Sequence, residues 1–138
     1  DTPVEQKNRP AEFSSEDLGS MTAHKIGTDT VIPLIEYPTD AGTFFVLALT
    51  FEQEGTYRFS LAASTEASEH AQMAVTLNLD GTVLHTYSYH GGSTAPVTLS
   101  RDKEVRGTTH YLKVFFSHSG LKLHELNIQR IGKLPVIK

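Results

Sequence analysis

The sequence predicts an all-β protein whose fold is an antiparallel two-sheet β-sandwich. Apolar and polar residues alternate in several short segments, as in residues 55–64 (GTYRFSLAAS), where Tyr57, Phe59 and Leu61 alternate with polar side chains. This period of two is typical of a strand with one buried face. Turn residues separate the segments, and no stretch has helical periodicity over ten residues. About seven or eight short strands joined by turns indicate a sandwich.

The composition is that of one globular domain. The chain has 138 residues, of which 38% are hydrophobic and 20% are charged, so it can bury a core of its own. A net charge of −4 and the lack of a Lys/Arg cluster argue against nucleic acid as a partner. No apolar run reaches the roughly 20 residues of a membrane helix, and we expect no membrane partner. The absence of cysteine excludes disulfides and thiol chemistry.

The N-terminal part is expected to differ from the rest. Residues 1–20 are polar and contain Pro3 and Pro10, which predicts a linker or irregular segment. Residues 21–138 are assigned to the sandwich domain.

Three strands are expected in the first half of this domain. Residues 31–37 (VIPLIEY) contain Pro33, which favours an edge or irregular strand. Residues 43–51 (TFFVLALTF) are almost wholly apolar, as expected for a strand buried on both faces. The alternating segment over 55–64 follows after a turn.

A hairpin is expected next. Asp80-Gly81 accepts the positive φ angles of a type I′ turn, so it predicts a hairpin between strands over 72–79 and 82–90. The core-facing residues of its first strand are Met73, Val75, Leu77 and Leu79. We then expect a loop over 91–96, a short strand over 97–100, a charged turn over 101–107 and a strand over 109–116.

The last apolar segment changes phase. Leu121 and Leu123 have odd numbers, whereas Leu126 and Ile128 have even ones. One extra residue near His124-Glu125, a β-bulge, would keep both pairs on the core face. A break between two strands is the alternative.

Six short motifs occur in the order that is found in carbohydrate-binding modules of families 6 and 35, and the chain resembles these modules over about two thirds of its length. The motifs are DAGTFF (40–45), GTYRFSLAAS (55–64), VTLNLDG (75–81), YHGGST (89–94), GTTHYLKVFF (107–116) and GLKLHELNI (120–128). The resemblance implies a β-jelly-roll that binds polysaccharide without catalysis. It also implies a sugar cleft among the loops at one end of the sandwich.

In these modules, two aromatic rings hold the faces of a sugar and an Asn side chain bonds its hydroxyls. The resemblance places the first aromatic near Tyr37. It places the second, a Trp, at Ser93, and the Asn at Lys122, so both of those residue types differ here. Tyr89 or His90 could take the place of the Trp. The predicted carbohydrate-binding residues are therefore Tyr37, Tyr89, His90, Ser93 and Lys122.

Tyr37, Tyr89 and Lys122 also have a purely structural interpretation. Tyr87 and Tyr89 share one strand face and could form a packed stripe. Tyr37 could pack in its loop, and Lys122 could be a solvated lysine. If Lys122 does bind, its ammonium group could donate to hydroxyls or pair with a uronate carboxylate.

Catalysis and metal chemistry lack sequence support. The seven histidines are scattered, without the close pairs of a zinc site, and there is no G-x-S-x-G elbow. We therefore expect a protein that is not an enzyme and needs no cofactor. The resemblance allows a structural calcium, for which Glu12, Glu16 and Asp17 are the candidate ligands.

The leading hypothesis is a secreted or cell-surface module, covalently linked to a glycan-active enzyme such as a glycoside hydrolase, which holds that enzyme on polysaccharide. The alternative is an accessory β-sandwich that no longer binds sugar and serves protein packing or assembly. A small jelly-roll lyase is a third, weaker option.

Overall fold

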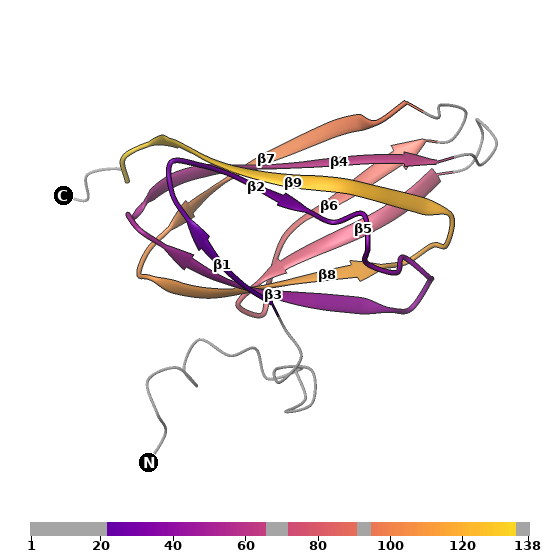
Figure 1. Ribbon diagram of the computed structural model, residues 1–138, viewed down its shortest axis with the longest axis horizontal. Helices are drawn as coiled ribbons and strands as arrows, with labels where there is room; N and C mark the ends of the chain where they lie inside the picture. The colour runs from indigo at the N-terminus through magenta and orange to yellow at the C-terminus, as the bar shows by residue number, and fades with distance from the viewer. Residues whose placement is uncertain (1–21, 66–71, 91–94, 135–138) are drawn as a thin grey trace, which may run out of the picture.

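The structure is a computed structural model that describes residues 22–65, 72–90 and 95–134. The described residues form nine strands and no helix, folded as two facing sheets (Figure 1). The predicted all-β sandwich is therefore confirmed. The strands are β1 Thr22–Ile26, β2 Asp29–Pro33, β3 Phe44–Phe51, β4 Gly55–Thr65, β5 Gln72–Leu79, β6 Thr82–His90, β7 Val97–Val105, β8 Thr109–Phe116 and β9 Leu121–Gly132.

One sheet has five strands in the order β1-β3-β8-β5-β6, and the other has four in the order β2-β9-β4-β7. Every pair is antiparallel except β1 with β3, which is parallel. The sequence did not predict β1 or this parallel pair. The five residues of β1, TAHKI, show no clear alternation. They form a strand because β3 supplies the backbone partners from Leu47 to Phe51.

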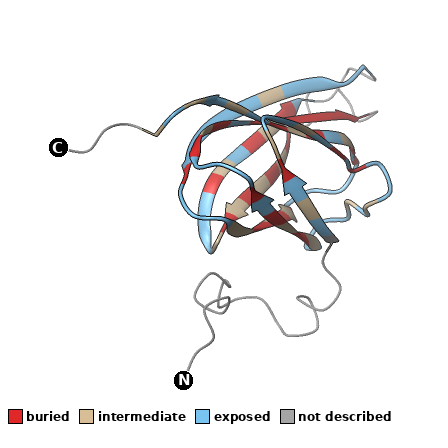
Figure 2. Ribbon diagram, turned by 60° about the vertical axis from the view of Figure 1, so that its left-hand side comes forward, coloured by how far each residue is buried: buried red, intermediate tan, exposed pale blue. Residues whose placement is uncertain are grey.

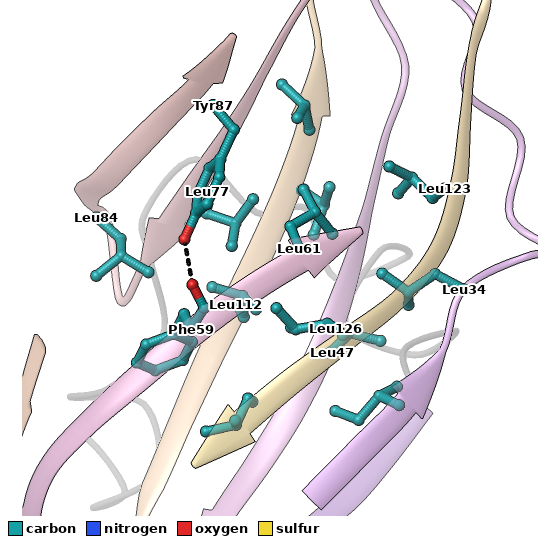
Figure 3. Close-up of a cluster of buried hydrophobic side chains, with 14 of the residues drawn as sticks. Leu34, Leu47, Phe59, Leu61, Leu77, Leu84, Tyr87, Leu112, Leu123 and Leu126 are labelled. Carbon is teal, nitrogen blue, oxygen red and sulfur yellow. Dashed lines mark hydrogen bonds between the residues drawn. The ribbon is translucent and has the colours of Figure 1, made fainter. Parts of the chain in front are cut away.

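The core lies between the two sheets, and buried positions alternate with exposed ones along the strands (Figure 2). In β4, the side chains of Tyr57, Phe59 and Leu61 are fully buried, as the alternation predicts. Figure 3 shows leucines of both sheets meeting there. In β3, Val46 is also buried, against Tyr111 on the outer face of the five-stranded sheet. This second cluster explains why 43–51 is apolar on both faces.

The phase change in the last segment is a β-bulge within one continuous strand. Ala62 of β4 pairs with Glu125 and Ala63 pairs with Leu123, so His124 is the extra residue of β9. The core-facing side chains on both sides of the bulge are almost fully buried: Leu121, Leu123, Leu126 and Ile128. The bulge prediction is confirmed, and no break divides the strand.

The hairpin turn also agrees with the prediction. Asp80 has a φ angle of 54° and Gly81 one of 88°, the two positive values of a type I′ turn. Leu79 and Thr82 pair directly beside the turn.

The charged turn predicted over 101–107 is wrong, because residues 101–105 continue β7. This strand pairs with β4 along its whole length, from Val97 to Val105. It lies at the edge of its sheet, where charged side chains reach solvent and discourage pairing with other chains. Arg58 of β4 and Asp102 of β7 form an exposed bidentate pair, with N–O distances of 2.9 and 3.3 Å.

Candidate functional site

The predicted sugar site corresponds to one end of the sandwich, at the right of Figure 1. The 34–43 loop joins β2 to β3 there, and the 117–120 turn joins β8 to β9. The two segments are fastened together. The Thr39 hydroxyl donates to the Leu121 carbonyl, and the Ala41 amide donates to the Ser119 hydroxyl at 2.8 Å.

Tyr37 lies in this loop with its ring against the core. Its ring stacks on Phe45, with 4.0 Å between the centroids and 18° between the planes, and Phe45 in turn packs on Phe116 at 6.0 Å. The Tyr37 amide donates to the Leu34 carbonyl at 3.2 Å. Tyr37 remains partly exposed. A partly exposed ring held by a second ring has a fixed orientation at the loop surface.

Lys122 is exposed at the start of β9, opposite Ser64 of β4. The bond from Thr39 to the Leu121 carbonyl joins the loop of Tyr37 to the residue directly before Lys122. The structure therefore brings the Tyr37 loop and the Lys122 backbone to the same end of the molecule.

His90 is exposed at the end of β6, at the same end of the sandwich but on its far side. Strands β8 and β5 lie between β3 and β6. Three strand spacings separate β3 from β6, which amounts to about 14 Å. His90 is thus set apart from the loop of Tyr37. Ser93 lies outside the described residues.

Tyr89 is buried rather than presented to solvent, with 3% of its surface exposed. Its hydroxyl donates to the Leu61 carbonyl, while the Tyr87 hydroxyl donates to the Phe59 carbonyl at 2.8 Å (Figure 3). Burial raises the pKa of both phenols well above the ordinary value. The two tyrosines form the packed stripe of the structural interpretation, and Tyr89 offers no free ring face to a sugar.

This stripe ties the edge strand β6 to the opposite sheet, which gives a stability prediction. We expect Tyr87→Phe and Tyr89→Phe each to lower the free energy of unfolding by about 1–2 kcal/mol, because each removes one buried hydrogen bond. Urea unfolding followed by circular dichroism measures the loss. Thr86→Val on the exposed face of β6 is the control. If the tyrosine variants lost no more stability than Thr86→Val, the two hydroxyls would not be holding β6 to the opposite sheet.

The sequence analysis missed Phe45 and the pair formed by Ser64 and His124. Phe45 faces the core at the loop end of β3, but residues 43–51 are apolar on both faces, so the sequence does not show which face Phe45 takes. The Ser64 hydroxyl and His124 Nε2 lie 2.7 Å apart beside the bulge. No sequence signal indicates that pair, because it depends on the register between β4 and β9.

Within 22–65, 72–90 and 95–134, no three His, Asp or Glu side chains gather closely enough to hold a metal ion. The calcium candidates Glu12, Glu16 and Asp17 lie outside those ranges. None of the described segments is a helix long and apolar enough to cross a membrane.

The chain is similar in sequence and in structure to parts of known enzymes. No family model matches the chain. A β-glucosidase of Ruminococcus albus is 27% identical over 132 residues, which is 95% of this chain but 14% of that enzyme. In structure, a β-glucosidase from Paenibacillus barengoltzii matches with a TM-score of 0.66 and 16% identity, over 87% of this chain and 12% of that one. The chain thus spans only a small part of the enzymes that it matches.

Isolated carbohydrate-binding modules match over almost their whole length. The C-terminal family 6 module of LamC, a laminarinase from Zobellia galactanivorans, matches with a TM-score of 0.57 and 17% identity, over 74% of this chain and 99% of the module. The fold is the β-sandwich that such carbohydrate-binding modules have. Modules of families 35 and 36 match it as well. The predicted family 6 and 35 resemblance is therefore confirmed at the level of the fold.

Proposed function

We propose that this chain is a non-catalytic carbohydrate-binding module whose sugar site is the loop end around Tyr37 and Lys122. The observation that carries the proposal is the partly exposed ring of Tyr37, stacked on Phe45 in a loop that is bonded to the β9 start. The fold shared with modules of families 6, 35 and 36 supports it.

The chemistry of the loop end suits a sugar. A pyranose ring has C–H groups on its faces, which pack on an aromatic ring, and hydroxyls at its rim, which take hydrogen bonds. Tyr37 would supply the ring and Lys122 would supply charged donors to hydroxyls or to a uronate carboxylate. His90 would contact only a longer oligosaccharide, because the separation of about 14 Å between β3 and β6 exceeds the length of one sugar unit. Ser93 remains a predicted contact.

Binding through so few groups should be weak. One stacked ring contributes on the order of 1 kcal/mol beyond its burial, and a net hydrogen bond contributes about the same. Set against the entropy of association, these contributions predict a dissociation constant of roughly 0.1–1 mM. Such an affinity suits a module that acts through a linked partner, since linkage raises the local concentration of substrate.

We further propose that the chain belongs to a secreted or cell-surface enzyme that acts on glycans. Support comes from the two β-glucosidases, in which the matching region is 14% and 12% of the protein. In that setting the module would hold the catalytic domain on polysaccharide.

An accessory sandwich without sugar binding is the second candidate. It is favoured by the two positions where the resemblance requires Trp and Asn and this chain has Ser93 and Lys122. A glycan array followed by calorimetry on any hit separates the two. Millimolar or tighter binding supports the first, whereas no binding across neutral and acidic glycans supports the second. Release of reducing ends or unsaturated products by the purified chain would contradict both.

Tyr37 gives the most specific mutational prediction for the site. We expect Tyr37→Ala to abolish detectable binding in calorimetry, because it removes the stacking ring. The melting temperature should fall by only a few degrees, roughly the effect of one lost ring pair. Tyr37→Phe keeps the ring and should keep most of the affinity. Unchanged binding by Tyr37→Ala would mean that the sugar binds elsewhere.

A further inference from the structure

At the opposite end of the sandwich, the His110 side chain has an acceptor at each ring nitrogen. Its Nδ1 is hydrogen-bonded to the carboxylate of Asp80, and its Nε2 lies 2.7 Å from the carbonyl oxygen of Arg106. An ionised carboxylate and a carbonyl only accept hydrogen bonds, whereas neutral imidazole carries a single N–H. Both bonds form together only when the ring carries two protons and a positive charge.

The two bonds of His110 join separate parts of the fold. Asp80 is the first turn residue of the β5–β6 hairpin, and its carboxylate also accepts from the Tyr111 amide at 2.8 Å. Arg106 begins the connection from β7 to β8, which crosses between the sheets. The ring edge also contacts Phe51, with 5.5 Å between centroids. His110 therefore fastens a hairpin turn, an inter-sheet crossing and the core.

A second connection between the sheets, from β3 to β4, is hydrogen-bonded to the β7–β8 connection. The Gly107 amide donates to the Glu54 carboxylate at 2.6 Å, in the connection from β3 to β4. Arg130 of β9 donates to the Glu54 carbonyl through Nε and Nη2, at 3.1 and 3.0 Å. Loss of the hydrogen bond from His110 to the Arg106 carbonyl would thus disturb the contact between the β7–β8 and β3–β4 connections.

We propose that His110 is a pH-sensitive pin, charged when the domain is folded, which makes this end of the sandwich more stable in mildly acidic than in alkaline solution. The pin lies at the end away from Tyr37 and Lys122, so it acts on stability and not on contact with sugar.

The electrostatic surroundings agree with this assignment. Burial by itself lowers the pKa of His110, but the hydrogen bond and charge of Asp80, with the Arg106 and Gly107 backbone, raise the pKa above its ordinary value. The other charged side chains at this end include Lys25 of β1, Asp29 of β2, Glu52 and Glu54 after β3, Glu104 and Arg106 near the end of β7, Arg130 of β9 and Lys133 after it. Arg106 lies 3.7 Å from Glu104, so its guanidinium is drawn toward that carboxylate.

The sign of the pH effect follows from this pKa. A raised folded-state pKa gives stability that is complete below the unfolded value of about 6.5 and is lost as the pH rises through the folded value. His24 acts in the opposite direction, since burial lowers its pKa and its contribution falls as it becomes protonated. Variants of the pin therefore have to be compared through their pH dependence and not at a single pH.

The test is thermal unfolding of the whole chain between about pH 8.5 and pH 6. We expect the melting temperature to rise by roughly 3–6 °C as the pH falls. Asp80→Asn keeps a good I′ turn and the acceptor for the Tyr111 amide but removes the charge, and His110→Asn removes the ring. Both should lose most of that rise. His90→Asn, an exposed histidine at the other end, should keep it.

Nitrogen-15 NMR of the His110 ring gives the direct readout. At about pH 6.5 both ring nitrogens should carry a proton, and the titration midpoint of this ring should lie above that pH. An unprotonated ring nitrogen at that pH would overturn the proposal. So would an Asp80→Asn variant with the full pH dependence of the parent chain.

Discussion

Deletion of His124 is expected to unfold the domain or to lower its free energy of unfolding by about 4–6 kcal/mol. His124 is the extra residue of β9, which allows core-facing residues on both sides of the bulge to stay buried. Without it, Leu121 and Leu123 would turn to solvent, or the β4–β9 pairing would break. Each buried leucine contributes about 2–3 kcal/mol, and whole domains are stable by only about 5–15 kcal/mol. Urea unfolding followed by circular dichroism measures the effect.

His124→Ala is the matched control for this deletion. It keeps the residue count, and therefore the register, while it removes the 2.7 Å contact with Ser64. Its loss should be near that of one hydrogen bond, about 1 kcal/mol. If the deletion variant were as stable as His124→Ala, the bulge would not be setting the register of β9.

Gly55→Ala is expected to lower the free energy of unfolding by about 3 kcal/mol, as overpacking does in a buried place that has no room. A Cβ atom at Gly55 would lie 2.6 Å from the Gly132 carbonyl oxygen and 2.6 Å from Arg130 Nε. The arginine side chain can move away. The Gly132 carbonyl belongs to the β9 backbone, which is paired with β4 at this point, and it has to shift with the strand.

Gly132→Ala tests the same strand pair from the other side. A Cβ atom there meets no atom within 4 Å, so we expect little change in stability. Thermal and urea unfolding of the two variants should differ clearly. Equal stability of the two variants would show that the strands shift to make room for a Cβ atom at Gly55 without losing stability.

Most of the fold could be predicted because burial on one face leaves a period of two in the sequence. The phase change between Leu123 and Leu126 even located the bulge. Two elements left no such trace. Among residues 23–26 of strand β1, only Ile26 is buried, and the strand depends on β3 for its backbone partners. Residues 101–105 look like a turn because an edge strand exposes its charges.

The candidate site was harder to predict than the fold. The alternation of residues 82–90 indicates that Tyr89 is buried, but the resemblance to the modules made its ring a candidate sugar contact. The stacking of Tyr37 on Phe45 and the bond from Thr39 to the Leu121 carbonyl join residues far apart in sequence. Such contacts depend on how the loops fold over the end of the sandwich, which a strand pattern does not encode.

Chemical-shift mapping by NMR with an oligosaccharide hit from the array tests the sugar site most directly. We predict that amide shifts concentrate in residues 34–43 and 119–122 and disappear in Tyr37→Ala. One alternative surface is the shallow pocket of about 280 Å³ on the outer face of the five-stranded sheet, lined by Thr76, Asn78, Lys113 and Phe115. Shifts confined to those four residues, with Tyr37 and its loop unchanged, would contradict a sugar site at the loop end.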